Sequence, residues 1–279
     1  MHCHHFDAGR CRSCTWLPRP YAEQVRTIDA DARALVGTAA TRWEEPAVGP
    51  EAGFRNKAKM VVGGTLAEPT LGILDAELRG VDLRDCGLHE PAIVAALPVL
   101  AGFVTRAGLT PYDVAARTGE AKHVIVTASP DAELMVRFVL RSTEALPRVR
   151  KHLPWLLERL PARVVSVNLQ PEPKAVLEGA EELVLTEEQT LPMRLDVAGG
   201  LTLHLRPRSF FQTNTTIATE LYATAVRWCA DEAPREVLDL YCGVGGFGLA
   251  LADAGRRVRG VEVSADAVAS AERSRAEAH

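Results

Sequence analysis

The segment from Glu236 to Glu262 constrains the fold of this chain more than any other stretch. Val237–Leu240 is a short apolar run typical of a buried parallel strand, and glycines follow it at positions 243, 245, 246 and 248. We expect a helix to begin near Phe247 and a second strand over Val258–Val261. Glycines at such a turn let a ligand approach the loop and the helix N-terminus closely. The segment therefore predicts the first half of a nucleotide-cofactor site in an α/β domain.

The residues around the turn favour one cofactor over another. Gly243, Gly245 and Gly248, with Glu262 about 20 residues further on, also fit the fingerprint of NAD-binding proteins. Asp239, at the mouth of the first strand, would repel a pyrophosphate, whereas S-adenosylmethionine (SAM) carries a sulfonium and an ammonium group and no phosphate. We therefore interpret the site as a SAM site, with Glu262 bonding the ribose hydroxyls. A glycine turn that binds nothing is the alternative.

Length and composition predict two domains, the second of them incomplete. The chain has 279 residues and 47% apolar content, enough for about two domains with their own cores. We expect an α+β domain over residues 1–205 and the start of a Rossmann-like domain over 206–279. After Glu262 there is one more helical segment, Ala265–Ala278, whereas a doubly wound sheet needs several more strands. The second domain is therefore expected to be cut short.

Charge and targeting signals bear on the partner and the cellular location of the protein. The net charge of −4 neither supports nor excludes an RNA partner, since a local basic face can coexist with an acidic total. The chain has no apolar run of membrane-spanning length, and Met1–Asp7 does not resemble a secretory signal. We expect a cytoplasmic location, without a membrane partner or an evident protein partner.

The cysteines predict a metal centre. Of six cysteines, Cys3, Cys11 and Cys14 fall within twelve residues, and in a chain without export signals such a cluster indicates metal ligands rather than disulfides. Cys86 lies in an upstream polar loop and is the best candidate for a fourth ligand. One CxxC pair with two distant cysteines lacks the paired knuckles of structural zinc, so the spacing favours a 4Fe-4S cluster. A mixed zinc site remains open because histidines lie nearby, at positions 2, 4 and 5.

The rest of the first domain shows mixed strand and helix patterns. We expect residues 1–16 to form a loop around their cysteines, with no helical or strand period. Strand patterns occur at Leu71–Leu74, His123–Ala128, Leu134–Leu140, Val164–Leu169, Leu183–Leu185 and Leu201–Leu205. Helical patterns occur at Ala92–Arg106 and Leu146–Leu160. This order is typical of an α+β domain.

In two further segments of this domain, apolar and polar side chains are expected on opposite faces. Apolar residues from Tyr21 to Leu35 recur at helical spacing, so we expect a helix whose stripe joins the core. In the strand predicted over Phe54–Met60, basic side chains alternate with apolar ones, and Arg55, Lys57 and Lys59 share one face. That face is suited to phosphate contacts, and a lysine-protected edge strand is an equally good explanation.

The segment SFFQTN, Ser209–Asn214, joins the two halves. Asn214 is a good N-cap for a helix over Thr215–Ala230. That helix start places Gln212 beside the glycine turn, where its amide could bond a cofactor. A buried structural glutamine is the alternative.

Taken together, the early cysteines with Cys86, the strand FRNKAKM, the joint SFFQTN and the turn DLYCGVGGFG resemble the iron-sulfur-containing RNA uracil-C5 methyltransferases. The similarity runs over essentially the whole chain. Because the cysteine loop begins at Met1, the chain is most similar to the subgroup without an N-terminal TRAM RNA-binding domain, whose members methylate uridine 747 of 23S ribosomal RNA. The tRNA-modifying relatives are the near alternative.

The resemblance implies cofactors and ligands. It implies that Cys3, Cys11, Cys14 and Cys86 hold a 4Fe-4S cluster. It also implies that Gln212, Tyr241 and Glu262 contact SAM, and that the partner is RNA.

The resemblance also implies the chemistry. A cysteine thiolate adds to carbon 6 of the uracil, carbon 5 takes the methyl group, and a base removes the carbon 5 proton. In the family these groups lie in a Ser-Cys-Asn loop and a late Glu motif, and neither motif occurs in these 279 residues. Cys242 lies in the cofactor turn and Cys229 in a helix, so neither is a substitute. We therefore name no catalytic residue and expect the chain alone to be inactive. A non-catalytic iron-sulfur RNA-binding protein is the alternative hypothesis.

Overall fold

A seven-stranded sheet organises the N-terminal part of the computed structural model, which describes residues 1–173, 176–253 and 255–278. Its strands are β1 (Lys57–Gly64), β2 (Pro69–Leu74), β3 (Gly80–Asp82), β4 (Ala121–Ala128), β5 (Leu134–Leu140), β6 (Ala162–Leu169) and β7 (Glu181–Val184). The order across the sheet is β3-β2-β1-β4-β5-β6-β7. Only the β5–β6 pair is parallel, because the connection between these strands crosses over through a helix.

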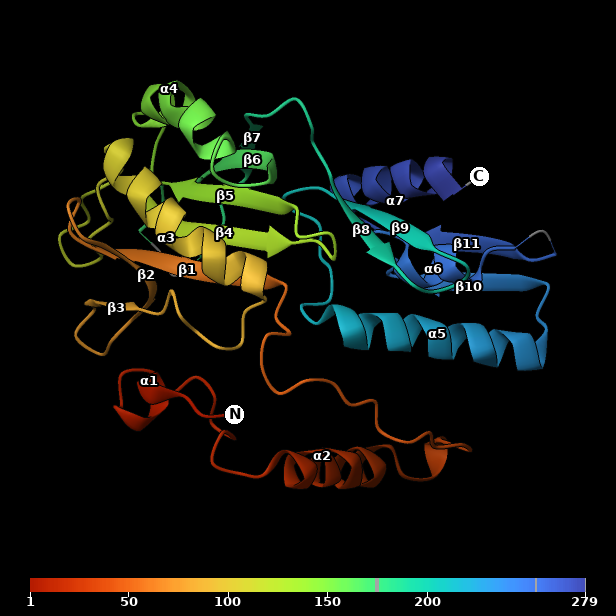
Figure 1. Cartoon of the computed structure of the whole chain (residues 1–279). Helices are drawn as coiled ribbons and strands as arrows, with labels where there is room; N and C mark the ends of the chain where they lie inside the picture. The colour runs from red at the N-terminus through yellow and green to blue at the C-terminus, as the bar shows by residue number, and fades with distance from the viewer. Residues whose placement is uncertain (174–175, 254, 279) are drawn as a thin grey trace.

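Two helices cover one face of this sheet, α3 (Pro91–Arg106) and α4 (Leu146–Leu157) (Figure 1). Alternate residues of the strands point at them, so Val124 and Val126 of β4 lie in one apolar core with Phe103 of α3 and Leu156 of α4. The sheet and its two helices confirm the predicted α+β character of this part.

Strand β1 lies inside the sheet, between β2 and β4. Ala58 and Met60 are buried in the core, whereas Lys59 is exposed on the opposite face, as the alternating pattern predicts. The hypothesis of a lysine-protected edge strand is therefore wrong, because β1 has a hydrogen-bonded strand on both sides.

A second apolar core lies beside the sheet (Figure 1). It is filled from β8 (Leu191–Leu195), β9 (Leu201–Leu205), α5 (Thr215–Glu232) and α6 (Gly246–Leu251), together with Met135 of β5 and Val164 of β6. The other elements of this part are β10 (Glu236–Leu240), β11 (Arg257–Val261) and α7 (Ala265–Ala278). Strands β8 and β9 pair antiparallel, whereas β10 and β11 pair parallel, as expected for a Rossmann-like unit. The division between residues 205 and 206 stays a prediction.

The predicted strand at 237–240 forms, but it is not buried on both faces. Leu238 is 58% exposed, and Leu240, Val261 and Val263 are exposed with it. Within the described residues, the pair β10–β11 is a separate two-stranded sheet. One face of this pair is therefore bare, because burial on both sides needs further layers.

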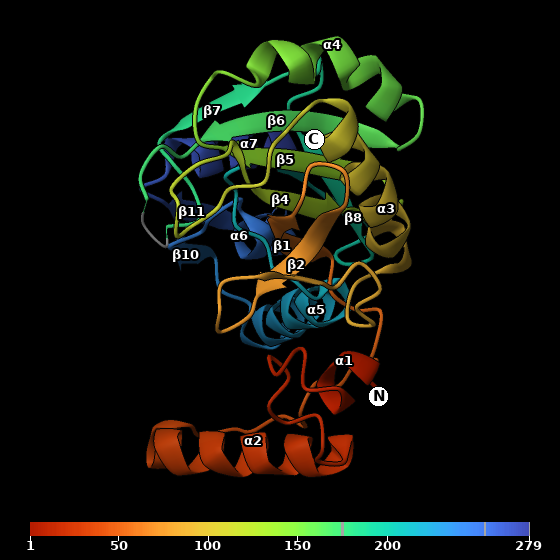
Figure 2. The ribbon, with the colours of Figure 1, turned by 90° about the vertical axis from the view of Figure 1, so that its left-hand side faces the viewer.

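The first forty residues differ most from expectation. Residues 1–16 contain a short helix, α1 (His4–Asp7). Its single turn is too short to produce a recognisable helical period in the sequence. The helix α2 (Tyr21–Val36), followed by the 3-10 turn η1 (Gly37–Ala39), forms as predicted, but none of its residues is buried. Both views show α2 at the edge of the molecule, away from the sheet (Figure 2).

The prediction that the apolar stripe of α2 joins the core is therefore wrong. Ile28 is 58% exposed and Leu35 is 88% exposed. The stripe lines an open hollow of about 580 Å³ with Trp43 of the following loop and Trp228 of α5. Periodicity indicates which side of a helix is apolar, but not what covers that side. No helix of the described parts of the chain has the length and apolar character needed to cross a membrane.

Candidate functional site

The glycine turn between β10 and α6 is shaped by left-handed backbone. Tyr241, Gly243 and Gly245 have φ values of 59°, 55° and 85°. The turn brings α6 close to α5, where a Cβ atom at position 246 would overlap the phenol ring of Tyr222. Glycine is thus required both by the backbone conformation and by the approach of the two helices.

The turn opens onto a pocket of about 400 Å³ between β10, β11, α6 and α7. Its lining includes Asp239, Gly248, Gly260 and Glu262. Parallel pairing places Asp239 opposite Gly260, so both strands end at the same edge as the pocket. Two carboxylates from the strand ends and a set of glycines therefore face one small cavity, whose lining also includes Glu272 and Arg275 of α7.

The two carboxylates differ in their surroundings. The Asp239 Oδ2 atom accepts a hydrogen bond of 2.8 Å from the Gly248 amide, and burial raises the pKa of Asp239 although this bond opposes the change. Glu262 accepts hydrogen bonds from the amides of Gly243, Val263 and Ser264 at 3.0, 2.8 and 2.8 Å. These amides, first that of Ser264, lower the pKa of Glu262. Glu262 is thus a firmly ionised acceptor at the pocket.

The three predicted cofactor residues do not all line this pocket. Glu262 does, whereas Gln212 and Tyr241 lie outside its lining. Tyr241 is 91% exposed at the start of the turn, and Gln212 is exposed in the joint before α5. The prediction that Asn214 caps α5 is confirmed, since its Oδ1 atom accepts from the Ile217 amide at 3.2 Å.

The four predicted metal ligands come from two separate segments, the loop around α1 and the turn before α3. Burial raises the pKa of the Cys14 thiol, and Cys86, Cys11 and Cys3 raise it further. Burial also raises the pKa of Cys86, to which Cys3 and Cys11 add. All six cysteines are free thiols. The structure thus brings the four thiols within reach of one another's charge.

A tighter group of polar side chains lies beside these cysteines. In the described part of the chain, one group of three potential metal ligands has its ligand atoms within 4.8 Å of one another. It consists of His4, His5 and Asp85. His5 Nε2 lies 2.6 Å from Asp85 Oδ1, and His4 Nε2 lies 3.2 Å from Asp85 Oδ2. His2 instead pairs with Asp7 at 2.9 Å. Sequence reasoning missed Asp85, although its position next to Cys86 was a usable signal.

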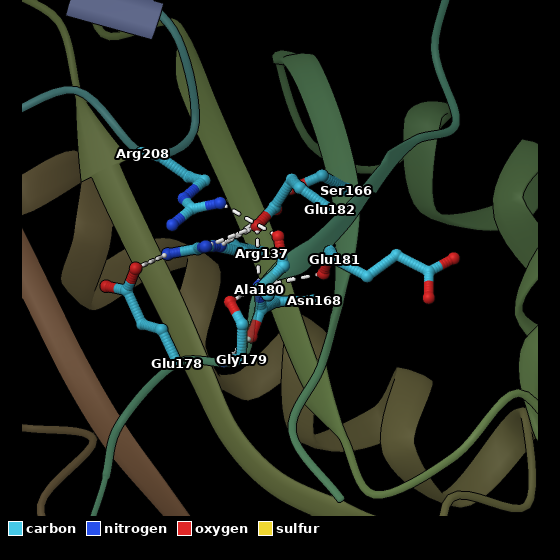
Figure 3. A network of polar contacts seen from close by, with 9 residues as sticks. All are labelled: Arg137, Ser166, Asn168, Glu178, Gly179, Ala180, Glu181, Glu182 and Arg208. Carbon is cyan, nitrogen blue, oxygen red and sulfur yellow. Dashed lines mark hydrogen bonds and ion pairs between the residues drawn. The ribbon is translucent and has the colours of Figure 1, made fainter. Parts of the chain in front are cut away.

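The face of the large sheet opposite its helices carries a buried polar network (Figure 3). Arg137 of β5 donates through Nε to Glu182 of β7 at 2.8 Å and pairs through Nη1 with Glu178 at 2.9 Å. Ser166 and Asn168 of β6 also bond Glu182, at 2.7 and 2.9 Å. Periodicity alone did not reveal this network, because its members come from three strands and, for Glu178, from the loop before β7.

The network reaches the joint between the two cores. Arg208 donates from Nη1 to the carbonyl of Ala180 at 2.8 Å, next to the segment that Asn168 holds (Figure 3). On the far side of the joint, Ser209 Oγ lies 3.1 Å from Ser270 Oγ of α7. The joint is therefore fixed by contacts from both halves of the chain.

A strand, glycine turn, helix and second strand ending in a carboxylate define the start of a Rossmann-like methyltransferase domain. The crystal structure of Pyrococcus abyssi tRNA (uracil-54, C5)-methyltransferase in complex with S-adenosyl-L-homocysteine has this fold. It matches with a TM-score of 0.75 and 22% identity, over 96% of this chain and 62% of that chain. At this identity the match shows the fold alone.

Sequence comparisons carry the assignment further. Residues 176–279 match the family model described as tRNA (Uracil-5-)-methyltransferase. The 23S rRNA (uracil(747)-C(5))-methyltransferase RlmC of Yersinia pseudotuberculosis serotype I (strain IP32953) is 46% identical over 277 residues, which cover 98% of this chain and 73% of that protein. RlmC of Escherichia coli O139:H28 (strain E24377A / ETEC) is 45% identical over 280 residues, covering 99% and 74%. The chain therefore belongs to the family of RNA uracil-C5 methyltransferases.

Proposed function

We propose that this chain belongs to an enzyme that transfers a methyl group from SAM to carbon 5 of uridine 747 in 23S ribosomal RNA. The observation that carries the proposal is the 46% identity to an RlmC protein over 98% of the chain. The tRNA relatives are the second candidate, and they are weaker because the solved tRNA enzyme is only 22% identical.

The test is methyl transfer to defined RNAs. The complete gene product, supplied with radiolabelled SAM, is expected to label a 23S rRNA fragment that contains uridine 747. A fragment with cytidine at that position should stay unlabelled. Labelling of tRNA but not of the rRNA fragment would transfer the assignment to the tRNA enzymes.

Within these residues the role in the reaction is to hold the cofactor. Glu262, at the end of β11, is the acceptor for the ribose hydroxyls, supported by its ionised state and its place in the pocket lining. Asp239 in the same pocket favours a cationic cofactor over one with phosphates. Gln212, exposed in the segment before α5, and Tyr241, exposed at the start of the glycine turn, are proposed to contact SAM from outside the pocket.

The four cysteines are proposed to hold a 4Fe-4S cluster. Two segments far apart in the sequence supply the four thiols, and burial, then the neighbouring thiols, raise the pKa of Cys14 and of Cys86. Four thiolates are the ligand set of a 4Fe-4S cluster, and one CxxC pair with two distant cysteines lacks the paired knuckles of structural zinc. The cluster would tie the loop around α1 to the turn that carries Cys86.

A further inference from the structure

Asn56 is a buried side chain that joins two distant parts of the chain. It is 1% exposed and lies directly before β1. Its Nδ2 atom donates to the carbonyl of Gln212 at 2.9 Å and to Thr215 Oγ1 at 2.8 Å. Its backbone amide donates to the carbonyl of Thr213 at 3.0 Å, and its carbonyl accepts from the Ala128 amide at 2.8 Å. One residue therefore bonds the joint twice, the start of α5 once and the large sheet once.

The residues before Asn56 bond the turn that carries Cys86. Gly53 donates to the carbonyl of Gly87 at 2.8 Å, and Arg55 donates to that of Leu88 at 2.8 Å. The Glu90 amide returns a bond of 3.1 Å to the Arg55 carbonyl. The backbone of Arg55 also forms isolated β-bridges with His89 and with Asn214. The segment 53–56 is thus held between the cysteine turn on one side and the joint on the other.

The side-chain amide of Asn56 is the hydrogen-bond donor that holds the backbone at Gln212. Its two acceptors, the Gln212 carbonyl and the Thr215 hydroxyl, are part-buried, and without this donor the joint would shift to recover water or another partner. The Gln212 side chain is exposed, and its direction therefore depends on how its own backbone is held. The Asn56 amide bonds that backbone directly at the Gln212 carbonyl.

We propose that Asn56 is a positioning residue, which holds the backbone of Gln212 so that the Gln212 amide meets the bound cofactor. Asn56 itself does not line the cofactor pocket. The inference rests on the proposed function, in which Gln212 contacts SAM. It assigns to the strand FRNKAKM a second task besides sheet formation, because that strand carries the anchor of the joint.

The test compares two buried side-chain amides in the complete gene product. Gln170 is 2% exposed and its side chain accepts from Lys122, which also bonds the Glu172 carbonyl, so Gln170→Leu is the control for the loss of a buried amide. Calorimetry with S-adenosylhomocysteine is expected to show about tenfold weaker binding in Asn56→Leu and a change below about twofold in Gln170→Leu. The KM for SAM should rise in Asn56→Leu, while affinity for the RNA fragment stays the same.

A second variant removes the partner instead of the anchor. Thr215→Val takes away one acceptor of the Asn56 amide without altering the core, and it is expected to weaken S-adenosylhomocysteine binding about threefold. It serves alone if Asn56→Leu does not fold. Unchanged binding in Thr215→Val and Asn56→Leu, or equal losses in Asn56→Leu and Gln170→Leu, would overturn the inference. Failure of the unsubstituted protein to bind S-adenosylhomocysteine would instead contradict the proposed function.

Discussion

The carboxylate of Glu262 and the amide of Gly243 are joined by a hydrogen bond of 3.0 Å. The end of β11 is thereby fastened to the glycine turn that follows β10. Three backbone amides donate to this carboxylate, which has about four acceptor positions, so about one is left for the ribose of the proposed cofactor.

Replacing Glu262 tests the cofactor site. Glu262→Ala removes the acceptor for the ribose hydroxyls and loosens the turn, so SAM binding measured by calorimetry should weaken roughly 10- to 100-fold. Glu236→Ala, at the exposed start of β10, is the control and should leave binding unchanged. NADH should not bind. Tight NADH binding without SAM binding would rule out the methyltransferase assignment.

The cysteine site predicts iron and sulfide in the purified protein. Prepared without oxygen, the protein should be brown and contain both elements. Cys86→Ala should lose the iron and lower the yield of folded protein, because in the proposed cluster Cys86 ties its turn to the N-terminal loop. Cys229→Ser on α5 should keep the full iron content. A colourless protein with one zinc per chain is the opposing result.

Residues 1–279 alone should form no 5-methyluridine. Cys242 is the thiol nearest the pocket, and burial, then Asp239 and Glu262, raise its pKa. A thiol with a raised pKa is a poor nucleophile at neutral pH. Mass spectrometry of digested RNA measures the product, and formation of 5-methyluridine by this chain would show that one of its own cysteines is the nucleophile.

The buried pair of Arg137 and Glu182 predicts a large stability effect. Arg137 is 2% exposed, so Arg137→Leu leaves the Glu182 carboxylate buried without its main partner. Urea unfolding should show a loss of about 3–5 kcal/mol. Arg159→Leu on the surface should cost less than about 0.5 kcal/mol. Equal small losses in both variants would mean that water replaces the pair.

The stability of the protein should fall in mild acid because of His123. Burial, then the cations of Lys122 and Lys59, lower the pKa of His123 from its ordinary value of 6.5 to about 4. Between these two pH values the unfolded state binds the proton and the folded state does not, so stability is complete above pH 6.5 and declines as the pH falls toward 4. His123→Leu should remove about 1–3 kcal/mol of that decline, measured as the unfolding free energy at pH 7 and at pH 4.5. Parallel pH profiles for the two proteins would contradict this.

The sequence predicted those features of the fold that depend on neighbouring residues. The glycine turn, the cap at Asn214 and the alternation in β1 depend on local backbone chemistry, and each forms as expected. Strand β8 was missed because Pro192 argues against a strand, yet a two-stranded sheet tolerates a proline on its free edge.

What could not be predicted depends on partners far along the chain. The stripe of α2 has the pattern of a core helix, and only the tertiary structure shows that Leu35 stays exposed. The residues around Asn56 give no sign of its role, because that role depends on its distant partners Gln212 and Thr215. Ligation of a metal by the four cysteines stays a prediction, made from the spacing that metal chemistry restricts.

The bonds of Asn56 also bear on how the protein is made. Its two side-chain partners lie 156 and 159 residues later in the chain. At a synthesis rate of about 5–20 residues per second, the anchor waits roughly 8–30 s for them. During that interval β1 can pair with β2, whereas the buried amide of Asn56 is still without acceptors. The last step in closing the N-terminal half therefore belongs to the time when the ribosome has already begun the cofactor half.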